Sequence, residues 1–319
     1  MHSPTFKISS RIARTSVAIA AAFALAACTA SGTTGDADPT TSSNGSNTAL
    51  SMDSDLHALL PEDIQQSGKL LIGSPMSSPP LLFTDNGKPT GIAYDLSVDL
   101  GTILGVSVEW QDMAFPGVIP GLQGGNIDLS MGVIGDTAER QKVLDFVDLF
   151  KNESSLLTQK GNPKQVTDLD SVCGLTIGSQ TGSLQLVRLH SASDACVAAG
   201  KPAVTINEYT SQADGQAAVQ SERIAAYYAP YLTLNYVART AGNGQIFEMG
   251  TGRYPDNPFA IAMQKDRGSL AKAVQGALLQ LVQSGRYLEI MQAYGSEAAA
   301  VDASQVLING AGTDAFPLD

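Results

Sequence analysis

The sequence predicts an α/β fold made of two lobes. Short apolar segments typical of strands alternate with segments of helical periodicity, and this alternation occurs in two separate runs. The two runs are joined by residues 151–160, an extended segment that contains neither Gly nor Pro. Because alternating strands and helices form parallel sheets covered on both faces, we expect each lobe to be a mostly parallel sheet flanked by helices.

The first run covers residues 69–143. Its expected strands are residues 69–74, 106–110 and 126–133. Between them, the helix over 95–104 carries Leu96, Leu100 and Ile103 on one face. A second, short helix around Val118 and Leu122 is expected to end at the following glycine pair.

The second run repeats the pattern. Its expected strands are residues 175–179, 203–209 and 223–228, and its expected helices are residues 183–189 and 212–220. A helix over 270–282 follows. Beyond it, Tyr287, Ile290, Met291 and Tyr294 recur at helical spacing, which we interpret as a face packed in the core.

The N-terminus predicts export. Three basic residues precede residues 16–27, an apolar run that is too short to span a bilayer. This pattern predicts that residues 1–27 are a signal peptide. The ending Leu25-Ala26-Ala27-Cys28 resembles the lipobox of bacterial lipoproteins, which implies that Cys28 is lipidated and becomes the mature N-terminus. The alternative is an ordinary signal peptide that contains a cysteine. We expect an extracytoplasmic protein that is lipid-anchored to the cell membrane.

The composition predicts a tether after Cys28 and limits the classes of binding partner. Residues 29–55 have almost no large apolar side chain, so we expect residues 28–67 to be the lipidated cysteine and a disordered tether. The chain has 19 Lys and Arg against 31 Asp and Glu, a net charge of −12. This charge argues against nucleic acid as a partner.

Two cysteines remain after Cys28, and in an exported chain they form a natural pair. A Cys173–Cys196 bond would close a loop worth about 3 kcal/mol in the entropy model. Two buried free thiols are the alternative. Only His190 lies near a cysteine, so we expect neither a metal site nor a cofactor.

Several short motifs occur in an order that resembles one family. They are residues 87–96 (GKPTGIAYDL), 115–128 (FPGVIPGLQGGNID), 136–140 with 145–146 (DTAER and DF), 178–183 (GSQTGS), 260–265 (AIAMQK) and 285–287 (GRY). Through them, residues 68–310 resemble the extracytoplasmic solute-binding proteins of polar amino acid ABC importers, which are bacterial solute-binding protein family 3.

The resemblance implies a hinged two-lobe clamshell, the type 2 periplasmic-binding-protein fold. The first lobe would comprise residues 68–155 and 253–300, and the second residues 156–252, with residues 301–319 as a tail. The chain would cross the hinge near residues 156–159 and 248–253. A solute binds between the lobes, and closure is a population shift toward the form that contacts it on both sides.

The resemblance also implies site residues. Arg140 matches an arginine that holds the ligand's α-carboxylate, because a planar guanidinium offers two parallel donors. The alternative is a surface ion pair with Glu139 or Asp136. Thr137 matches a threonine of the same turn, which either contacts the ligand or stabilises the turn. Ser183 matches a hydroxyl residue at a helix start, where capping and anion binding are compatible.

Other positions depart from the family's pattern. The aspartates that hold an ammonium fall at Pro230 and Ala225, so the ammonium half of the site is in doubt. Asp136, Glu208 or a backbone carbonyl remain as substitutes.

Three further positions complete the expected site. Where the family often has an aromatic residue that covers the ligand, this chain has Leu81. Where the family has a hydroxyl residue two positions before Thr137, this chain has Gly135. Because strand neighbours face opposite sides, either Tyr228 or Tyr227 faces the cleft.

We therefore expect a monomeric substrate-binding lipoprotein without enzymatic activity. It would capture a small carboxylate-bearing polar solute, an amino acid or a derivative, and deliver it to an ABC permease and its ATPase. Two alternatives stay open. One is a ligand sensor that docks a signalling receptor, and the other is a dehydratase- or lyase-like enzyme on the same scaffold.

Overall fold

The computed structural model describes residues 50–316. The expected signal peptide, Cys28 and most of the expected tether lie outside the described residues. Within this range, every helix is too short or too polar to cross a membrane.

One sheet runs through residues 50–316, with strand order β5-β1-β6-β12-β7-β10-β8-β9 and β11 paired to β7. Its strands are β1 (Lys69–Ser74), β5 (Ser107–Asp112), β6 (Leu129–Gly135), β7 (Leu144–Gln159), β8 (Thr176–Gln180), β9 (Thr205–Tyr209), β10 (Ala226–Pro230), β11 (Phe247–Met249) and β12 (Tyr254–Gln264). A small second sheet holds β2 (Ser77–Ser78), β3 (Leu82–Asp85) and β4 (Lys88–Thr90).

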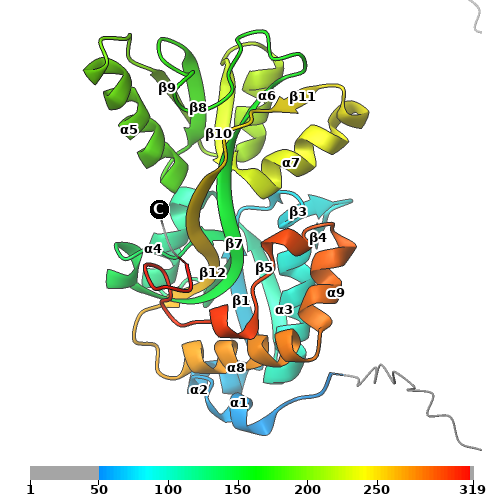
Figure 1. The fold of residues 1–319 in the computed structure, drawn as a ribbon. Coiled ribbons are helices and arrows are strands. Elements are labelled where there is room, and N and C mark those ends of the chain that lie inside the picture. Colours follow the sequence, from blue (N-terminus) through cyan, green and yellow to red (C-terminus); the bar gives the residue numbers. More distant parts are fainter. Residues whose placement is uncertain (1–49, 317–319) are drawn as a thin grey trace, which may run out of the picture. The chain divides into compact units, whose positions relative to one another are not determined.

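The strand directions divide the large sheet into two parallel parts. β1 is parallel to β5 and β6, and β8 is parallel to β9 and β10. The antiparallel strands β7 and β12 lie between these parts and connect them, as Figure 1 shows. β7 changes partner at Ser154, which pairs with both Tyr254 and Pro230. The expected two-lobe α/β architecture is confirmed.

The first lobe has one large core under its helices. These are α3 (Ile92–Leu104), α4 (Val118–Gln123), α8 (Leu270–Gln283) and α9 (Arg286–Ala293). The expected apolar face of α9 is confirmed, since Tyr287, Ile290 and Met291 are buried. The Tyr287 hydroxyl donates a hydrogen bond to the Leu149 carbonyl at 2.7 Å, which satisfies its polar end inside the core.

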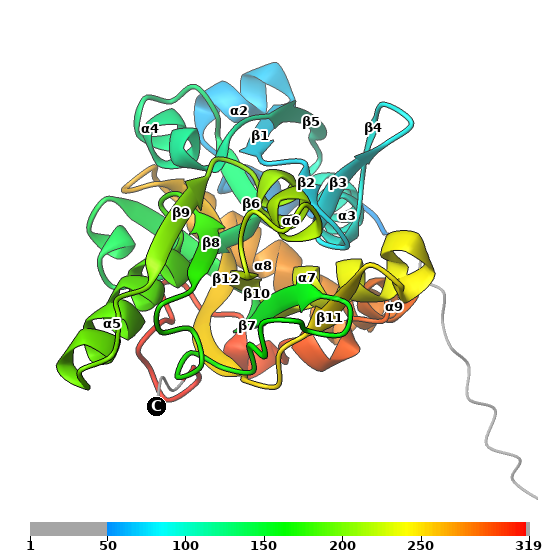
Figure 2. The same cartoon turned by 90° about the horizontal axis from the view of Figure 1, so that it is seen from above.

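The second lobe has helices on both faces of its sheet. α5 (Leu184–Ala198) lies on one side of β8 and β9, α6 (Gln212–Gln220) lies on the other, and α7 (Tyr231–Thr240) follows β10 (Figure 2). Serine side chains cap α5 and α6, because Ser183 accepts from the Leu186 N–H and Ser211 from the Asp214 N–H. The expected disulfide is confirmed, with the Cα atoms of Cys173 and Cys196 5.6 Å apart.

Residues 54–67 correct one expectation. They were expected to be disordered tether, but they form α1 (Ser54–Ala58) and α2 (Glu62–Ser67). The reason is local, since Leu60 and Ile64 are buried in the first-lobe core and Asp53 caps α1. These apolar residues offset the entropy of ordering the chain.

The C-terminal segment, residues 300–316, returns to the first lobe. Ala300 and Ile308 form isolated bridges with Phe150 and Val147 of β7. The 3-10 helix η4 (Glu297–Ala299) directly precedes this segment and η5 (Ala303–Gln305) lies within it, while η3 (Ala241–Gly244) follows α7 in the second lobe. The segment therefore adds backbone pairing to the strand that joins the lobes.

Candidate functional site

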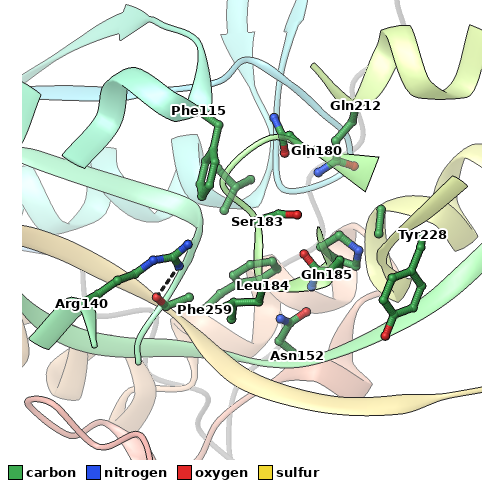
Figure 3. Close-up of a pocket in the computed structure, with 14 residues that line it drawn as sticks. Phe115, Arg140, Asn152, Gln180, Ser183, Leu184, Gln185, Gln212, Tyr228 and Phe259 are labelled. Carbon is green, nitrogen blue, oxygen red and sulfur yellow. Dashed lines mark hydrogen bonds between the residues drawn. The ribbon is translucent and has the colours of Figure 1, made fainter. Parts of the chain in front are cut away.

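A pocket lies between the two lobes, where strands β6, β8 and β10 end (Figure 3). Ligands of open α/β sheets bind outside the carboxyl ends of the strands, so this is the expected place for a site. The lining residues come from both lobes and are Phe115, Val133, Gly135, Arg140, Asn152, Gln180, Ser183, Leu184, Gln185, Gln212, Tyr228, Ala229, Pro230 and Phe259. The cavity volume is about 20 Å³, which is room for about one water molecule.

Arg140 supplies the positive charge of this pocket. It begins the 3-10 helix η2 (Arg140–Lys142) that follows β6. Its Nη1 donates to the Gly135 carbonyl at 2.8 Å, and its Nη2 donates across the lobes to the Gly182 carbonyl at 3.0 Å. The guanidinium carbon also lies 5.7 Å from the centre of the Phe115 ring from η1 (Phe115–Gly117).

Arg140 stays charged and has no acidic partner. Burial lowers the pKa of its guanidinium to about 10, and the nearby Asp136 charge opposes that change. The alternative of a surface ion pair is not observed, because Glu139 pairs with Lys142 and Asp136 accepts from Gln141. Among the described residues, one hydrogen on each Nη atom and the Nε hydrogen of Arg140 have no acceptor. The site therefore presents a cation that has free donors and no direct contact with a carboxylate among the described residues.

The structure places the other matched residues of this turn differently. The Thr137 Oγ1 accepts from the Arg140 N–H at 3.1 Å and does not line the pocket, so it stabilises the turn that carries Arg140. Gly135 lines the pocket, and its carbonyl holds the guanidinium. Ser183 lines the pocket while its Oγ caps α5 by accepting from the Leu186 N–H at 3.1 Å.

Leu81 and Tyr228 have contrasting positions. Leu81 is fully buried in the first-lobe core and is not among the lining residues, so the structure does not bring it to the pocket. Its position depends on how β3 packs on the core, which the pattern of one proline and one apolar residue does not reveal. Tyr228 lines the pocket, whereas Tyr227 packs against the opposite face near Gly215. The Tyr228 hydroxyl points toward Arg188, 3.4 Å away.

A match to a family model covers residues 70–297, and that family is the bacterial extracellular solute-binding proteins, family 3. The chain belongs to this family. These proteins are extracytoplasmic solute-binding proteins, and the relatives described below bind amino acids.

Individual relatives agree with this assignment. The chain is 28% identical over 257 residues to the arginine-binding protein ArgT of Corynebacterium glutamicum, covering 80% of this chain and 83% of ArgT. An ancestral arginine-binding protein bound to arginine is 28% identical, with a TM-score of 0.64, and the match covers 72% of this chain and 98% of that one. The ancestral amino acid-binding protein AncCDT-1, a precursor of cyclohexadienyl dehydratase, is 25% identical with a TM-score of 0.62 over 73% of this chain and 97% of its own.

In this family 3 protein, the pocket contains carboxamides that the sequence analysis did not identify. Gln180, Gln185, Gln212 and Asn152 all line it. Gln180 is the last residue of β8, and Gln212 begins the helix that follows β9, so their places near the carboxyl ends of two strands are a signal that the sequence offered. Gln185 offered none, because a glutamine in the first turn of a helix is ordinarily exposed.

The lining has no acid among the described residues. Pro230, where the family's pattern places an ammonium-binding aspartate, lines the pocket. Neither proposed substitute reaches it, since Asp136 is buried beneath the turn and Glu208 is exposed on β9. A backbone carbonyl remains as the substitute left open by the sequence.

Proposed function

We propose that this protein is the substrate-binding lipoprotein of an ABC importer. It captures a small carboxylate-bearing polar solute, an amino acid or a derivative, between its lobes and delivers it to a membrane permease. One observation carries the proposal, namely that Arg140 is a charged guanidinium at the interlobe pocket with free donors and no acidic partner among the described residues. A carboxylate would accept from this fork in a charge-assisted pair.

The proposal includes movement of the lobes. A cavity of about 20 Å³ cannot hold an amino acid, so a solute enters only when the lobes move apart, and the lobes then close around it less tightly than in this structure. The Arg140–Gly182 bond joins the lobes in this structure. A ligand carboxylate competes for the same guanidinium, which makes closure depend on what occupies the pocket.

The lining chemistry favours binding over catalysis. Among the described residues of the lining, histidine, cysteine and carboxylate side chains are absent, so no side chain there suits general acid–base work near neutral pH. The hydroxyl of Ser183 already serves as a helix cap. Lipid anchoring at Cys28 and a monomeric state belong to the same proposal, and the pattern of residues 23–28 supports the anchor.

Calorimetry with a panel of amino acids, N-modified amino acids and sugars tests the proposal. We expect a carboxylate to bind, and Arg140→Ala to weaken that binding by at least about 2 kcal/mol, near 30-fold. The control is Arg223→Ala, which removes an exposed arginine of the second lobe. A sugar as the sole binder, or equal affinities of wild type and Arg140→Ala, contradicts the proposal.

A further inference from the structure

Gln185 has a fixed orientation in the pocket. Its Nε2 lies 2.8 Å from the Ser154 Oγ and 2.9 Å from the Asp256 Oδ2. The two acceptors lie side by side, since the Ser154 hydroxyl donates to the Asp256 Oδ2, so one amide hydrogen points at both. A flipped amide would put its oxygen against the Asp256 carboxylate, so the observed orientation is the favourable one.

The carbonyl oxygen of Gln185 therefore faces the pocket. Gln185 is 5% exposed and lines the cavity, and its Oε1 has no hydrogen-bond donor among the described residues. Figure 3 shows this side chain beside Ser183 and Asn152. Because this oxygen is free to accept, a ligand that places a donor against it gains a hydrogen bond inside the closed pocket.

The carboxylate that holds the Gln185 amide is itself neutralised by an ion pair. Asp256 has only 4% of its side chain exposed, and its Oδ1 is ion-paired to the Arg188 Nη1 at 2.9 Å. Arg188 also donates to the Pro255 carbonyl at 2.9 Å. The Asp256 charge is thus neutralised beside the pocket, and Gln185 presents an amide dipole rather than an anion.

The charges of the lining favour a ligand with a neutral N–H donor over a ligand with an ammonium. A ligand carboxylate pairs directly with Arg140, which is the one charged side chain of the described lining, whereas Asp136 lies behind the turn and does not reach the pocket. An ammonium on the same ligand would be desolvated with no counter-charge in the lining, whereas a neutral N–H needs only the Gln185 carbonyl. The neighbouring carboxamides of Gln180 and Gln212 offer both donors and acceptors, which suit the carbonyl of an amide.

We propose that Gln185, held by Asp256 and Ser154, selects a carboxylic acid whose α-nitrogen is an acylated, neutral amide N–H. This inference rests on the proposed function, since it assumes that Arg140 holds the carboxylate. Gln185 contacts the ligand nitrogen, and Asp256 is a positioning residue that acts through Gln185.

Calorimetry on three matched probes tests this selection. For alanine, glutamine, arginine and phenylalanine side chains, the probes are the free amino acid, the N-acetyl amino acid and the O-acetyl 2-hydroxy acid, in which an ester oxygen replaces the N–H. For the side chain that binds best, we expect wild type to bind the N-acetyl form at least about 10-fold more tightly than either other form, the effect of one lost buried hydrogen bond.

Variants separate selection from structure. In Gln185→Met the preference for N-acetyl over ester should fall below about 3-fold, because the acceptor is gone. Asp256→Asn should reduce the same ratio, because an amide at residue 256 lets Gln185 flip. Gln220→Met, on an exposed glutamine of α6, should leave the ratio unchanged. A folding defect alone lowers the active fraction but does not alter a ratio of affinities.

The outcomes also separate this inference from the proposed function. Tighter binding of free amino acids by wild type, or equal binding of N-acetyl and ester forms, overturns the role of Gln185. If such a free amino acid binds more weakly to Arg140→Ala than to wild type, the proposed function is kept and only the role of Gln185 is rejected. The absence of any carboxylate whose binding depends on Arg140 overturns both.

Discussion

Asp148→Asn is the perturbation that probes a buried acid pair beneath the pocket. Asp136 and Asp148 are both fully buried, and the C-terminal segment donates its Ala311 N–H to one and its Gly310 N–H to the other, at 3.0 Å and 3.1 Å. The Asp148 Oδ1 has no partner in the described structure. Burial, followed by the Asp136 charge, raises the pKa of Asp148 to about 8, so the pair holds a proton at neutral pH.

The sign of the effect follows from this raised pKa. The unfolded chain loses the Asp148 proton near its ordinary pKa of 3.8, whereas the folded chain keeps it until about 8. The stabilising contribution is therefore complete below about pH 4 and is lost as the pH rises toward 8. One extra proton in the folded state gives a slope of about 1.4 kcal/mol per pH unit, which is an upper limit for this pair.

Urea unfolding at pH 5, 6 and 7 measures the slope. In Asp148→Asn residue 148 no longer titrates, so the free energy of unfolding should depend less on pH than in wild type. Asp194→Asn, on an exposed aspartate of α5, is the matched control and should keep the wild-type slope. All other titrating groups are shared, so the difference isolates the pair. Parallel curves for wild type and Asp148→Asn would refute the shared proton.

Two further predictions concern the cysteines. Replacing both Cys173 and Cys196 by Ser should lower the free energy of unfolding by about 3 kcal/mol in the chain-entropy model, measured by urea unfolding against wild type under non-reducing conditions; an unchanged midpoint contradicts it. Cys28→Ala should move the protein from the detergent phase to the aqueous phase or block its processing, as seen by phase partitioning; wild-type partitioning of the variant rules out the anchor.

Periodicity and local chemistry were enough to predict most of the fold. The helix expected over residues 95–104 lies within α3, and the serine expected at the start of the helix near residue 183 caps α5. These features depend on contacts within one or two turns, which neighbouring residues determine. The cysteine pair was predictable by elimination, because an exported chain leaves few alternatives for two cysteines.

The tether shows where that approach fails. Residues 54–67 form helices that are stable only because Leu60 and Ile64 pack on the first lobe. The return of residues 300–316 to β7 is similar, since its two bridges pair residues that are at least 150 positions apart in the chain. Isolated helices and strands this short are marginal, so tertiary packing decides whether they form.

For the candidate site, the sequence by itself determined that a guanidinium and a hydroxyl line the pocket, and it determined the turn that carries Arg140. Only the tertiary structure decided that Leu81 lies in the core, that Thr137 supports the turn, and that Gln185 faces the pocket with its oxygen. The orientation of that amide depends on Asp256, which is 71 residues away in sequence. Hydrogen-bond direction is set by partners that only folding brings together, so no local pattern encodes it.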